Sequence, residues 1–115
     1  MQSYQLFIKL YQGVEIQIGK LGLFTFPKGT YVYTGSAKRN IDKRITRHLS
    51  TEKNLHWHID YLLANYKSKV INVIKSEIAE CNLNERLKGK IIAKGFGSSD
   101  CKENCQSHLK FIGHQ

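Results

Sequence analysis

The chain opens with alternating apolar and polar side chains, a pattern that predicts a β-strand over residues 4–10. After the turn dipeptide Gln12-Gly13, a second alternating run at 14–18 predicts a strand that pairs with the first as a hairpin. Residues 30–34 are rich in β-branched and aromatic side chains, so they predict a third strand. We expect this third strand to end at Gly35-Ser36.

Helical spacing of apolar residues follows. With Asn40 as N-cap, the first predicted helix carries its apolar stripe at Ile41, Ile45, His48 and Leu49. Two further helices are predicted from Ile59, Leu62, Leu63 and Tyr66, and from Ala79, Leu83 and Leu87. The run 70–74 is apolar on both faces, which is typical of a central strand. Residues 91–92 and 109–111 are candidates for short strands.

These elements predict one domain over residues 1–115, of the α/β (α+β sandwich) class. We expect helices packed on a small mixed or antiparallel sheet. The sequence contains no apolar run long enough to span a bilayer, and we find no secretory signal. A cytoplasmic protein is therefore expected.

Charge adds the first indication of a partner. Eighteen Lys and Arg stand against nine Asp and Glu, giving a net charge of +9. Such a field attracts polyanions, of which phosphate backbones are the commonest. The positive charge is also clustered within ten residues, at Lys38, Arg39, Lys43, Arg44 and Arg47. This clustering favours nucleic-acid binding over a basic surface kept only for solubility. A membrane surface is disfavoured as a partner because no predicted helix carries an exposed apolar stripe.

Tyrosines and a following Arg–His pair form the first candidate site. Tyr31 and Tyr33 share a strand face, and Tyr4 joins them if the first and third strands are neighbours. Arg44 and His48 are one helical turn apart. Taken singly, the arginine reads as a snorkelling side chain and the histidine as a core residue. Their combination with the strand tyrosines and a glycine favours a polar cleft.

An acid on the third predicted helix is the next candidate. Glu80 shares the apolar face with Leu83 and Leu87, whereas Glu85 is rotated toward solvent. A carboxylate on an apolar face is costly unless something pairs with it. The alternative is a first-turn acid favoured by the helix dipole.

Two histidine- and cysteine-bearing segments complete the candidates. In the segment His56-Trp57-His58-Ile59-Asp60 the histidines are candidates for phosphate contacts or for a helix-start cluster. A zinc site would draw on Cys81, Cys101, Cys105 and His108. Because the spacing is not that of a common zinc finger, we favour a cysteine-bearing surface loop without metal.

The motifs together resemble the GIY-YIG nuclease superfamily. Tyr33-Thr34-Gly35 is similar to the second half of the signature, with threonine in place of the usual isoleucine, and Gln2-Ser3-Tyr4 supplies only the tyrosine of the first half. The closer resemblance is to an uncharacterised archaeal and bacterial branch, sometimes fused to endonuclease III. It extends over 29–37, 44–49, 56–63, Glu80-Cys81, 96–101 and 107–109.

This resemblance implies metal-dependent hydrolysis of phosphodiester bonds. We expect DNA ahead of RNA as the partner, and either a monomer or a homodimer. It implies that Glu80, with Asp60 in reserve, holds Mg²⁺ or Mn²⁺, and that Tyr4 or Tyr33 positions or deprotonates the attacking water. Arg44 would stabilise phosphate charge, and His48 would orient the tyrosine or shuttle a proton. The backbone contacts implied are Lys38, Arg39, Lys43, Arg47, His56 and His58. The alternative is a non-catalytic nucleic-acid-binding module of the same fold, either with or without a stabilising zinc ion.

Overall fold

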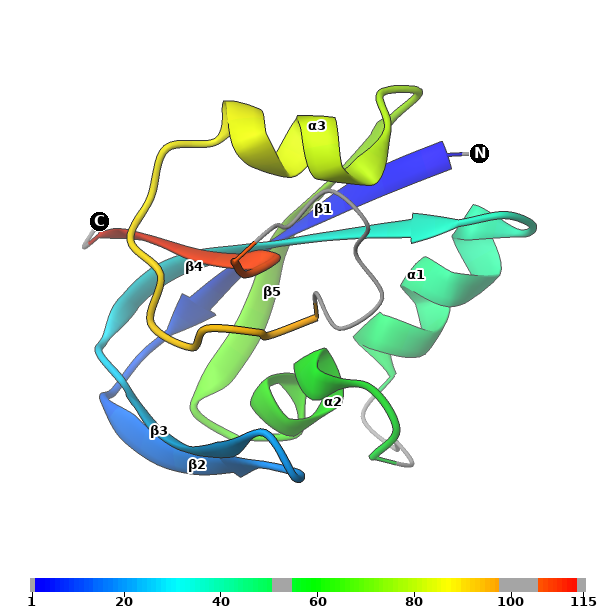
Figure 1. Ribbon diagram of the computed structural model, residues 1–115. Helices are drawn as coiled ribbons and strands as arrows, with labels where there is room; N and C mark the ends of the chain where they lie inside the picture. Colours follow the sequence, from blue (N-terminus) through cyan, green and yellow to red (C-terminus); the bar gives the residue numbers. More distant parts are fainter. Residues whose placement is uncertain (1, 51–54, 98–105, 114–115) are drawn as a thin grey trace.

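The computed structural model describes residues 2–50, 55–97 and 106–113. Six strands and three helices are assigned within these ranges. In chain order they are β1 (Gln2–Leu10), β2 (Val14–Ile18), β3 (Gly22–Phe26), β4 (Gly29–Ala37), α1 (Ile41–Leu49), α2 (His58–Leu63), β5 (Ser68–Ser76), α3 (Glu80–Arg86) and β6 (Leu109–Gly113). Figure 1 shows the strands β5, β1, β4 and β6 crossing the middle of the molecule with the helices around them. The predicted α+β class is confirmed.

The central sheet has the strand order β5-β1-β4-β6, and each neighbouring pair is antiparallel. β1 and β4 lie side by side with Tyr4 opposite Gly35 and Leu6 opposite Tyr33. The alternating residues of β1 are at most 1% exposed, at Tyr4, Leu6, Ile8 and Leu10. The period-two pattern therefore identified both the strand and its core face correctly.

The predicted pairing of the second strand is wrong. β2 pairs with β3 rather than with β1, and the two form a separate two-stranded sheet. Both edges of β1 are already occupied, one by β4 and the other by β5, so β2 finds no free edge there. The strand β3 was not predicted, although Leu23 and Thr25 alternate with Phe24 and Phe26 along it.

The position predicted for β5 is also wrong. This strand lies at the edge of the sheet, where Ile71 is 50% and Ile74 is 42% exposed. Its register against β1 shifts between Phe7 and Ile8, so one residue of β5 bulges out of the pairing. Residues 91–92 form no strand, and only Lys90 makes an isolated bridge to Phe111; the predicted strand at 109–111 is confirmed as part of β6.

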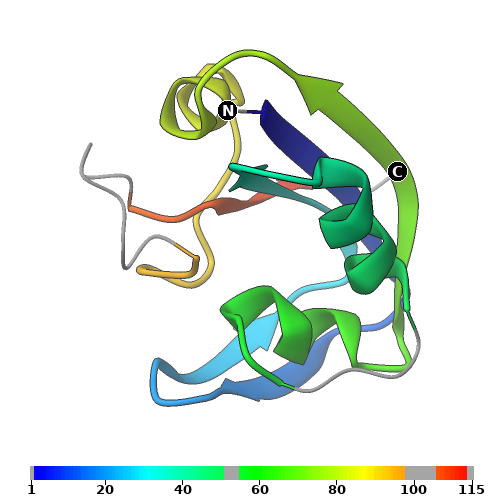
Figure 2. The same cartoon turned by 90° about the vertical axis from the view of Figure 1, so that its right-hand side faces the viewer.

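The helices cover both faces of the sheet. α1 and α2 lie on one side together with the β2–β3 hairpin, and α3 lies on the other (Figure 2). Asn40 does precede α1, but its side chain makes no capping hydrogen bond; its φ is 55°, and its carbonyl accepts from the N–H groups of Lys43 and Arg44. α2 ends at Leu63, earlier than predicted, and Tyr66 is 86% exposed.

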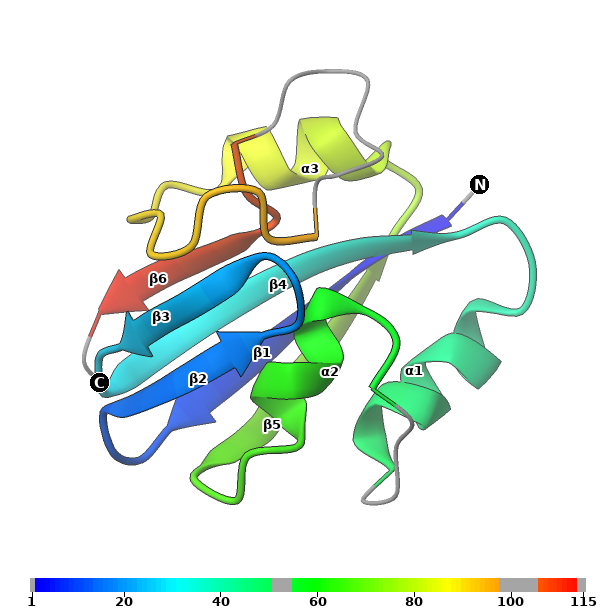
Figure 3. The same cartoon turned by 60° about the horizontal axis from the view of Figure 1, so that its bottom comes forward.

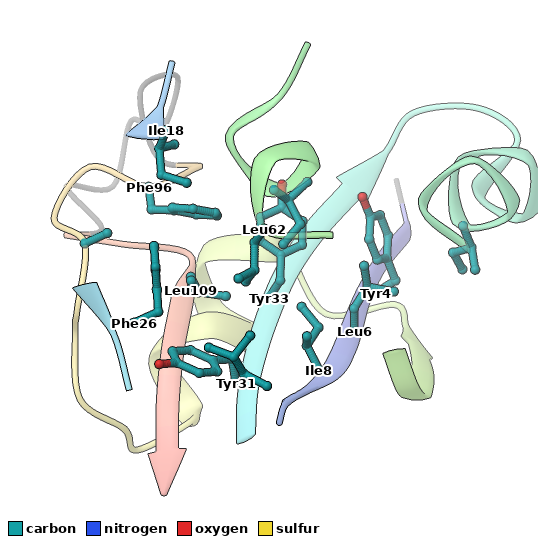
Figure 4. Packing of buried hydrophobic residues seen from close by; sticks show 14 of the residues in the cluster. Tyr4, Leu6, Ile8, Ile18, Phe26, Tyr31, Tyr33, Leu62, Phe96 and Leu109 are labelled. Atoms are coloured by element: carbon teal, nitrogen blue, oxygen red, sulfur yellow. The ribbon is translucent and has the colours of Figure 1, made fainter. Parts of the chain in front are cut away.

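The main core lies between the sheet and the hairpin layer. Figure 3 shows the β2–β3 hairpin and α2 in front of β1 and β4. Between these layers pack Ile18, Phe26, Leu62 and Phe96, as Figure 4 shows. Tyr31 belongs to this core rather than to a cleft, because its ring packs on Phe111 and its hydroxyl donates to the Pro27 carbonyl at 2.5 Å.

Within the described residues, β6 pairs with only part of β4. β6 begins at Leu109, which faces Tyr33, so residues 34–37 of β4 extend past its start. α1 approaches this end of β4 from one face and α3 from the other. The fold therefore brings residues from both faces of the sheet together at this end of β4.

Candidate functional site

A pocket of about 220 Å³ lies at this end of β4, between α1 and α3. It is lined by Tyr4, Tyr33, Ser36, Arg44, Trp57, Glu80, Gly97 and His108. These residues come from β1 and β4, from α1, from the residue before α2, from the start of α3, from the turn at Gly97 and from the residue before β6. Four of the five residues predicted to be catalytic thus share one cavity, and the fifth, His48, lies directly behind Tyr4.

Tyr4 and His48 form a buried pair. The Tyr4 hydroxyl lies 2.7 Å from Nε2 of His48, and the two rings are 5.5 Å apart. His48 faces inward from α1 and is 2% exposed. Burial raises the pKa of Tyr4 above its usual range; the cationic Arg44 opposes this shift, and the Glu80 carboxylate adds to it. The Tyr4 phenol is therefore neutral near pH 7.

Tyr33 lies beside this pair on β4. Its ring centroid is 6.4 Å from that of Tyr4 and 6.1 Å from that of His48. Burial raises the pKa of Tyr33 as well, and the neighbouring Tyr4 and Glu80 add to the shift. Both strand tyrosines therefore enter the pocket as hydrogen-bonding phenols rather than as phenolates.

Gly35 makes room for the Tyr4 phenol. It lies opposite Tyr4 in the β1–β4 pairing, and a Cβ at this position would be 2.5 Å from the Tyr4 hydroxyl oxygen. No real Cβ tolerates such a contact with a buried ring. The glycine that ends the Tyr33-Thr34-Gly35 motif is therefore explained by packing against the tyrosine on the neighbouring strand.

Arg44 is held at the mouth of the pocket by two contacts. Its Nη1 donates to the Ser36 carbonyl at 2.8 Å, and its guanidinium carbon lies 4.7 Å from the centre of the Trp57 ring. Ser36 and Arg44 also line an adjacent cavity with the exposed Lys38 and Arg39. The cationic surface therefore continues from the pocket over the start of α1, where Lys43 is exposed as well.

Glu80 supplies the carboxylate that lines the pocket. It is the first residue of α3, and its side chain is 26% exposed. Oε1 accepts from the Ser36 hydroxyl at 3.2 Å, and Oε2 lies 3.1 Å from Nδ1 of His108. Glu85 faces solvent on the same helix, as predicted. The partly buried Glu80 is thus paired, which offsets the cost of placing an acid there.

The donor set at Glu80 fits a hard divalent cation better than zinc. Mg²⁺ commonly binds through one or two carboxylates plus waters and substrate phosphate oxygens. Near Glu80 the softer donors are Cys81 and His108, whose Sγ and Nε2 are 3.9 Å apart. In the ranges that the structure describes, no group of three or more His, Cys, Asp or Glu residues could hold a metal. Cys101 and Cys105 lie outside those ranges.

Asp60 does not line the pocket. Its carboxylate is fully buried, receives two hydrogen bonds from Arg47 at 2.9 and 3.0 Å, and accepts from the N–H groups of His56 and Trp57. Burial alone would raise the pKa of Asp60, but the hydrogen bonds from Arg47 and the two backbone groups outweigh it and lower the pKa. This acid therefore anchors the start of α2 to α1.

The two histidines of the same segment differ. His58 accepts from the Gly97 N–H through Nδ1 at 2.9 Å, and burial lowers its pKa. It holds the turn at Gly97, where φ is +66° and a Cβ would be 3.0 Å from the Tyr33 ring. His56 is exposed, with its ring 5.4 Å from that of Trp57. Of the two, His56 is the one open to a phosphate.

Four pocket residues were not among the predicted catalytic residues: Ser36, Trp57, Gly97 and His108. Ser36 follows the tyrosine–glycine motif directly, and Trp57 is the only tryptophan in the chain, so both carried a usable signal. His108 reaches the pocket because β6 pairs with β4, and Gly97 reaches it through the His108 N–H bond to the Phe96 carbonyl and its own bond to His58. No local pattern indicates these long-range contacts.

The fold and the pocket define a small α+β protein with a cationic cleft around one carboxylate and two buried phenols. Over residues 3–115 the chain matches the family described as "Domain of unknown function DUF123", and it belongs to that family. No curated protein and no solved structure matches the chain. None of the helices in the described ranges has the length and apolar character needed to cross a bilayer.

Proposed function

We propose that this protein is a metal-dependent endonuclease of the GIY-YIG type that hydrolyses phosphodiester bonds in DNA. The observation that carries the proposal is the shared pocket, in which Arg44, Glu80 and the Tyr4–His48 pair converge from three elements, β1, α1 and α3. A cation, a carboxylate and a hydrogen-bonded phenol around one small cavity are suited to a phosphate and an attacking water.

The pairing of the two strand motifs supports this assignment. Tyr4 lies opposite Gly35, so Gln2-Ser3-Tyr4 and Tyr33-Thr34-Gly35 run side by side at the same end of the sheet. Both segments belong to the resemblance to the nuclease superfamily. The tyrosine of the first segment packs against the glycine of the second, so the two segments meet at the pocket.

The residues can divide the chemistry as follows. Arg44 would bind a non-bridging phosphate oxygen and stabilise the charge that develops there. Glu80 would hold Mg²⁺ or Mn²⁺, which when bound neutralises charge on the phosphate and its leaving oxygen. The Tyr4 oxygen would accept a proton from the attacking water as the phenol proton passes to Nε2 of His48, 2.7 Å away. The raised pKa of Tyr4 suits such a relay better than a standing phenolate.

A cleavage assay tests the proposal. Labelled single-stranded, duplex and branched DNA and RNA are incubated with Mg²⁺ or Mn²⁺ and with wild type, Glu80→Gln or Arg44→Ala. We expect metal-dependent cutting that either substitution lowers roughly 100- to 1,000-fold, while binding to the same substrate persists. Glu85→Gln is the matched control, because this acid lies on the same helix and faces solvent. Cutting that survives Glu80→Gln would contradict the proposal.

A non-catalytic nucleic-acid-binding module is the second candidate. One observation favours it: burial of Tyr4 and Tyr33 keeps both phenols neutral, and a neutral phenol is a weak base. This alternative predicts salt-dependent binding with no cutting of any substrate in either metal. The same assay therefore separates the two candidates.

A further inference from the structure

Trp57 occupies an unusual position next to the pocket. This single tryptophan of the chain precedes α2 and lines the cavity. The guanidinium carbons of Arg44 and Arg47 lie 4.7 and 4.2 Å from the centre of its ring. Both distances are within the range of a cation–π contact, and arginine pairs with tryptophan more favourably than with other aromatics. One indole ring is thus shared by two cations from α1.

The backbone of Trp57 is fixed by Asp60. The Trp57 N–H donates to Oδ2 of Asp60 at 2.8 Å, and the Asp60 N–H donates to the Trp57 carbonyl at 2.9 Å. The same carboxylate binds Arg47 through two hydrogen bonds. Asp60, Arg47 and Trp57 therefore form a closed unit that joins α2 to α1, and its indole ring is presented to Arg44.

The two arginines depend on this unit differently. Arg47 is held by a buried carboxylate whatever the ring does. Arg44 donates to the Ser36 carbonyl, and its interaction with the Tyr4 hydroxyl opposes the burial that raises the pKa of that phenol. The Trp57 ring packs on the guanidinium itself. A guanidinium on a long flexible stem loses much rotamer freedom when it is fixed, so this ring contact helps to define its direction.

We propose that Trp57 is a positioning residue for Arg44, held in place by the Asp60–Arg47 ion pair. The inference rests on the proposed function, because Arg44 needs a fixed direction only if it binds the reacting phosphate. It also assigns Arg47 to the support of the ring rather than to a backbone phosphate. Electrostatic stabilisation requires a donor that is already oriented, since reorganisation during the reaction would cost rate.

The first test measures the position of Arg44 without any substrate. ¹⁵N NMR of the arginine Nε–Hε groups reports both the ring-current shift from the indole and the mobility of the guanidinium. In wild type we expect the Arg44 Hε signal to be shifted by the ring and its Nε to be rigid. In Trp57→Leu the ring-current shift should vanish and the Arg44 Nε should become mobile. In Trp57→Phe both the shift and the mobility should lie between those of wild type and those of Trp57→Leu.

Tyr61→Leu is the matched control, because Tyr61 is an aromatic residue of α2 that packs beside Gly19 and does not line the pocket. It should leave the Arg44 signal unchanged. An Arg44 Nε that stays rigid in Trp57→Leu would overturn the inference, whether or not the protein cuts DNA. If Trp57→Leu does not fold, Trp57→Phe answers the question, since an unchanged Arg44 shift and mobility there would also overturn it.

The second test compares single-turnover cleavage with binding. Trp57→Leu should lower the cleavage rate roughly 10- to 100-fold, since misplacement by about 1 Å has effects of this size, and should leave Kd for the substrate within about twofold. Trp57→Phe should recover part of the rate. A rate in Trp57→Leu equal to that in Tyr61→Leu would refute the positioning role. Failure of wild type to cleave would refute the proposed function alone, because the NMR result stands separately.

Discussion

Tyr4 and Gly35 show how a single contact sets the shape of the pocket. The phenol of Tyr4 crosses over the backbone of β4 at Gly35, where the opposing strand has no side chain. From there its hydroxyl reaches His48 on α1. The direction of the phenol therefore depends on the absence of a methyl group as much as on its hydrogen bond.

Gly35→Ala should consequently destabilise the protein and displace Tyr4. The added Cβ would lie 2.5 Å from the hydroxyl oxygen and 2.6 Å from Cζ of Tyr4, in a well-packed site. Overpacking of this kind costs about 1–3 kcal/mol, which urea unfolding would measure. Gly13→Ala is the control, because its Cβ would meet its nearest neighbour at 3.6 Å. Equal losses of stability in the two variants would contradict the packing argument.

The buried phenols should also make stability depend on alkaline pH. Burial raises the pKa values of Tyr4, Tyr31 and Tyr33 above the ordinary 10.0 in the folded protein. Their contribution is therefore complete below pH 10 and is lost as the pH rises above it. In an ultraviolet titration, the absorbance that Tyr4→Phe removes should appear above pH 10. In denaturant the same absorbance should titrate near pH 10; identical midpoints would refute the expectation.

At the scale of residues, the sequence predicted which side chains belong to the candidate site better than it predicted the residues that they contact. Tyr4, Tyr33, Arg44 and Glu80 were predictable because each combines an unusual residue type with a defined face of a strand or helix. Asp60 was named as the reserve metal ligand, whereas its buried carboxylate pairs with Arg47, an ion pair that joins two helices and that no local pattern indicates. His108 approaches Glu80 only through the pairing of β6 with β4, which residue spacing cannot reveal.

At the scale of strands and helices, local patterns again predicted the elements, whereas their long-range pairing was not predicted. Alternation predicted β1 because burial of one strand face leaves a local pattern, and β-branched and aromatic enrichment predicted β4. It did not predict that β2 pairs with β3, because strand pairing depends on which edges are free in the finished sheet. The apolar run in β5 indicated a central strand, yet Ile71 and Ile74 are exposed at an edge. Composition alone does not distinguish these two positions.

The junction between α1 and α2 should be a main determinant of local stability. Asp60→Asn removes the charge that binds Arg47 and two backbone N–H groups, and we expect a loss of about 3 kcal/mol at neutral pH, because breaking a buried pair leaves its partner uncompensated. Denaturant unfolding measures this loss. Asp42→Asn is the control: its pair with Lys75 is largely exposed and should be worth less than about 1 kcal/mol.

The pH dependence of this difference has a defined sign. The folded-state pKa of Asp60 is lowered from the ordinary 3.8, so its stabilising contribution is complete above about pH 4 and is lost as the pH falls toward the folded-state value. The gap in unfolding free energy between wild type and Asp60→Asn should therefore narrow below pH 4. A gap that stays constant down to pH 2 would show that the carboxylate charge is not what holds the junction.

The whole molecule combines a general and a local electrostatic feature. The net charge of +9 favours any polyanion. The cavity lined by Lys38, Arg39 and Arg44 adjoins the pocket and shares Ser36 with it, so the strongest local charge lies next to the candidate reaction centre. The sequence indicated both features, because the basic residues are close together along the chain; the adjoining cavities required the fold.

A salt titration of DNA binding separates these two contributions. Each phosphate contact contributes about 0.9 to the slope of log K against log salt for duplex DNA. Lys38→Gln should therefore reduce the magnitude of that slope by about one contact, measured by fluorescence anisotropy without divalent metal. Lys28→Gln removes the same charge at the opposite end of β4 and should leave the slope unchanged. If both substitutions change it equally, the DNA is attracted by net charge alone and has no preferred path past the pocket; if only Lys38→Gln changes it, the backbone crosses the start of α1 beside Arg44.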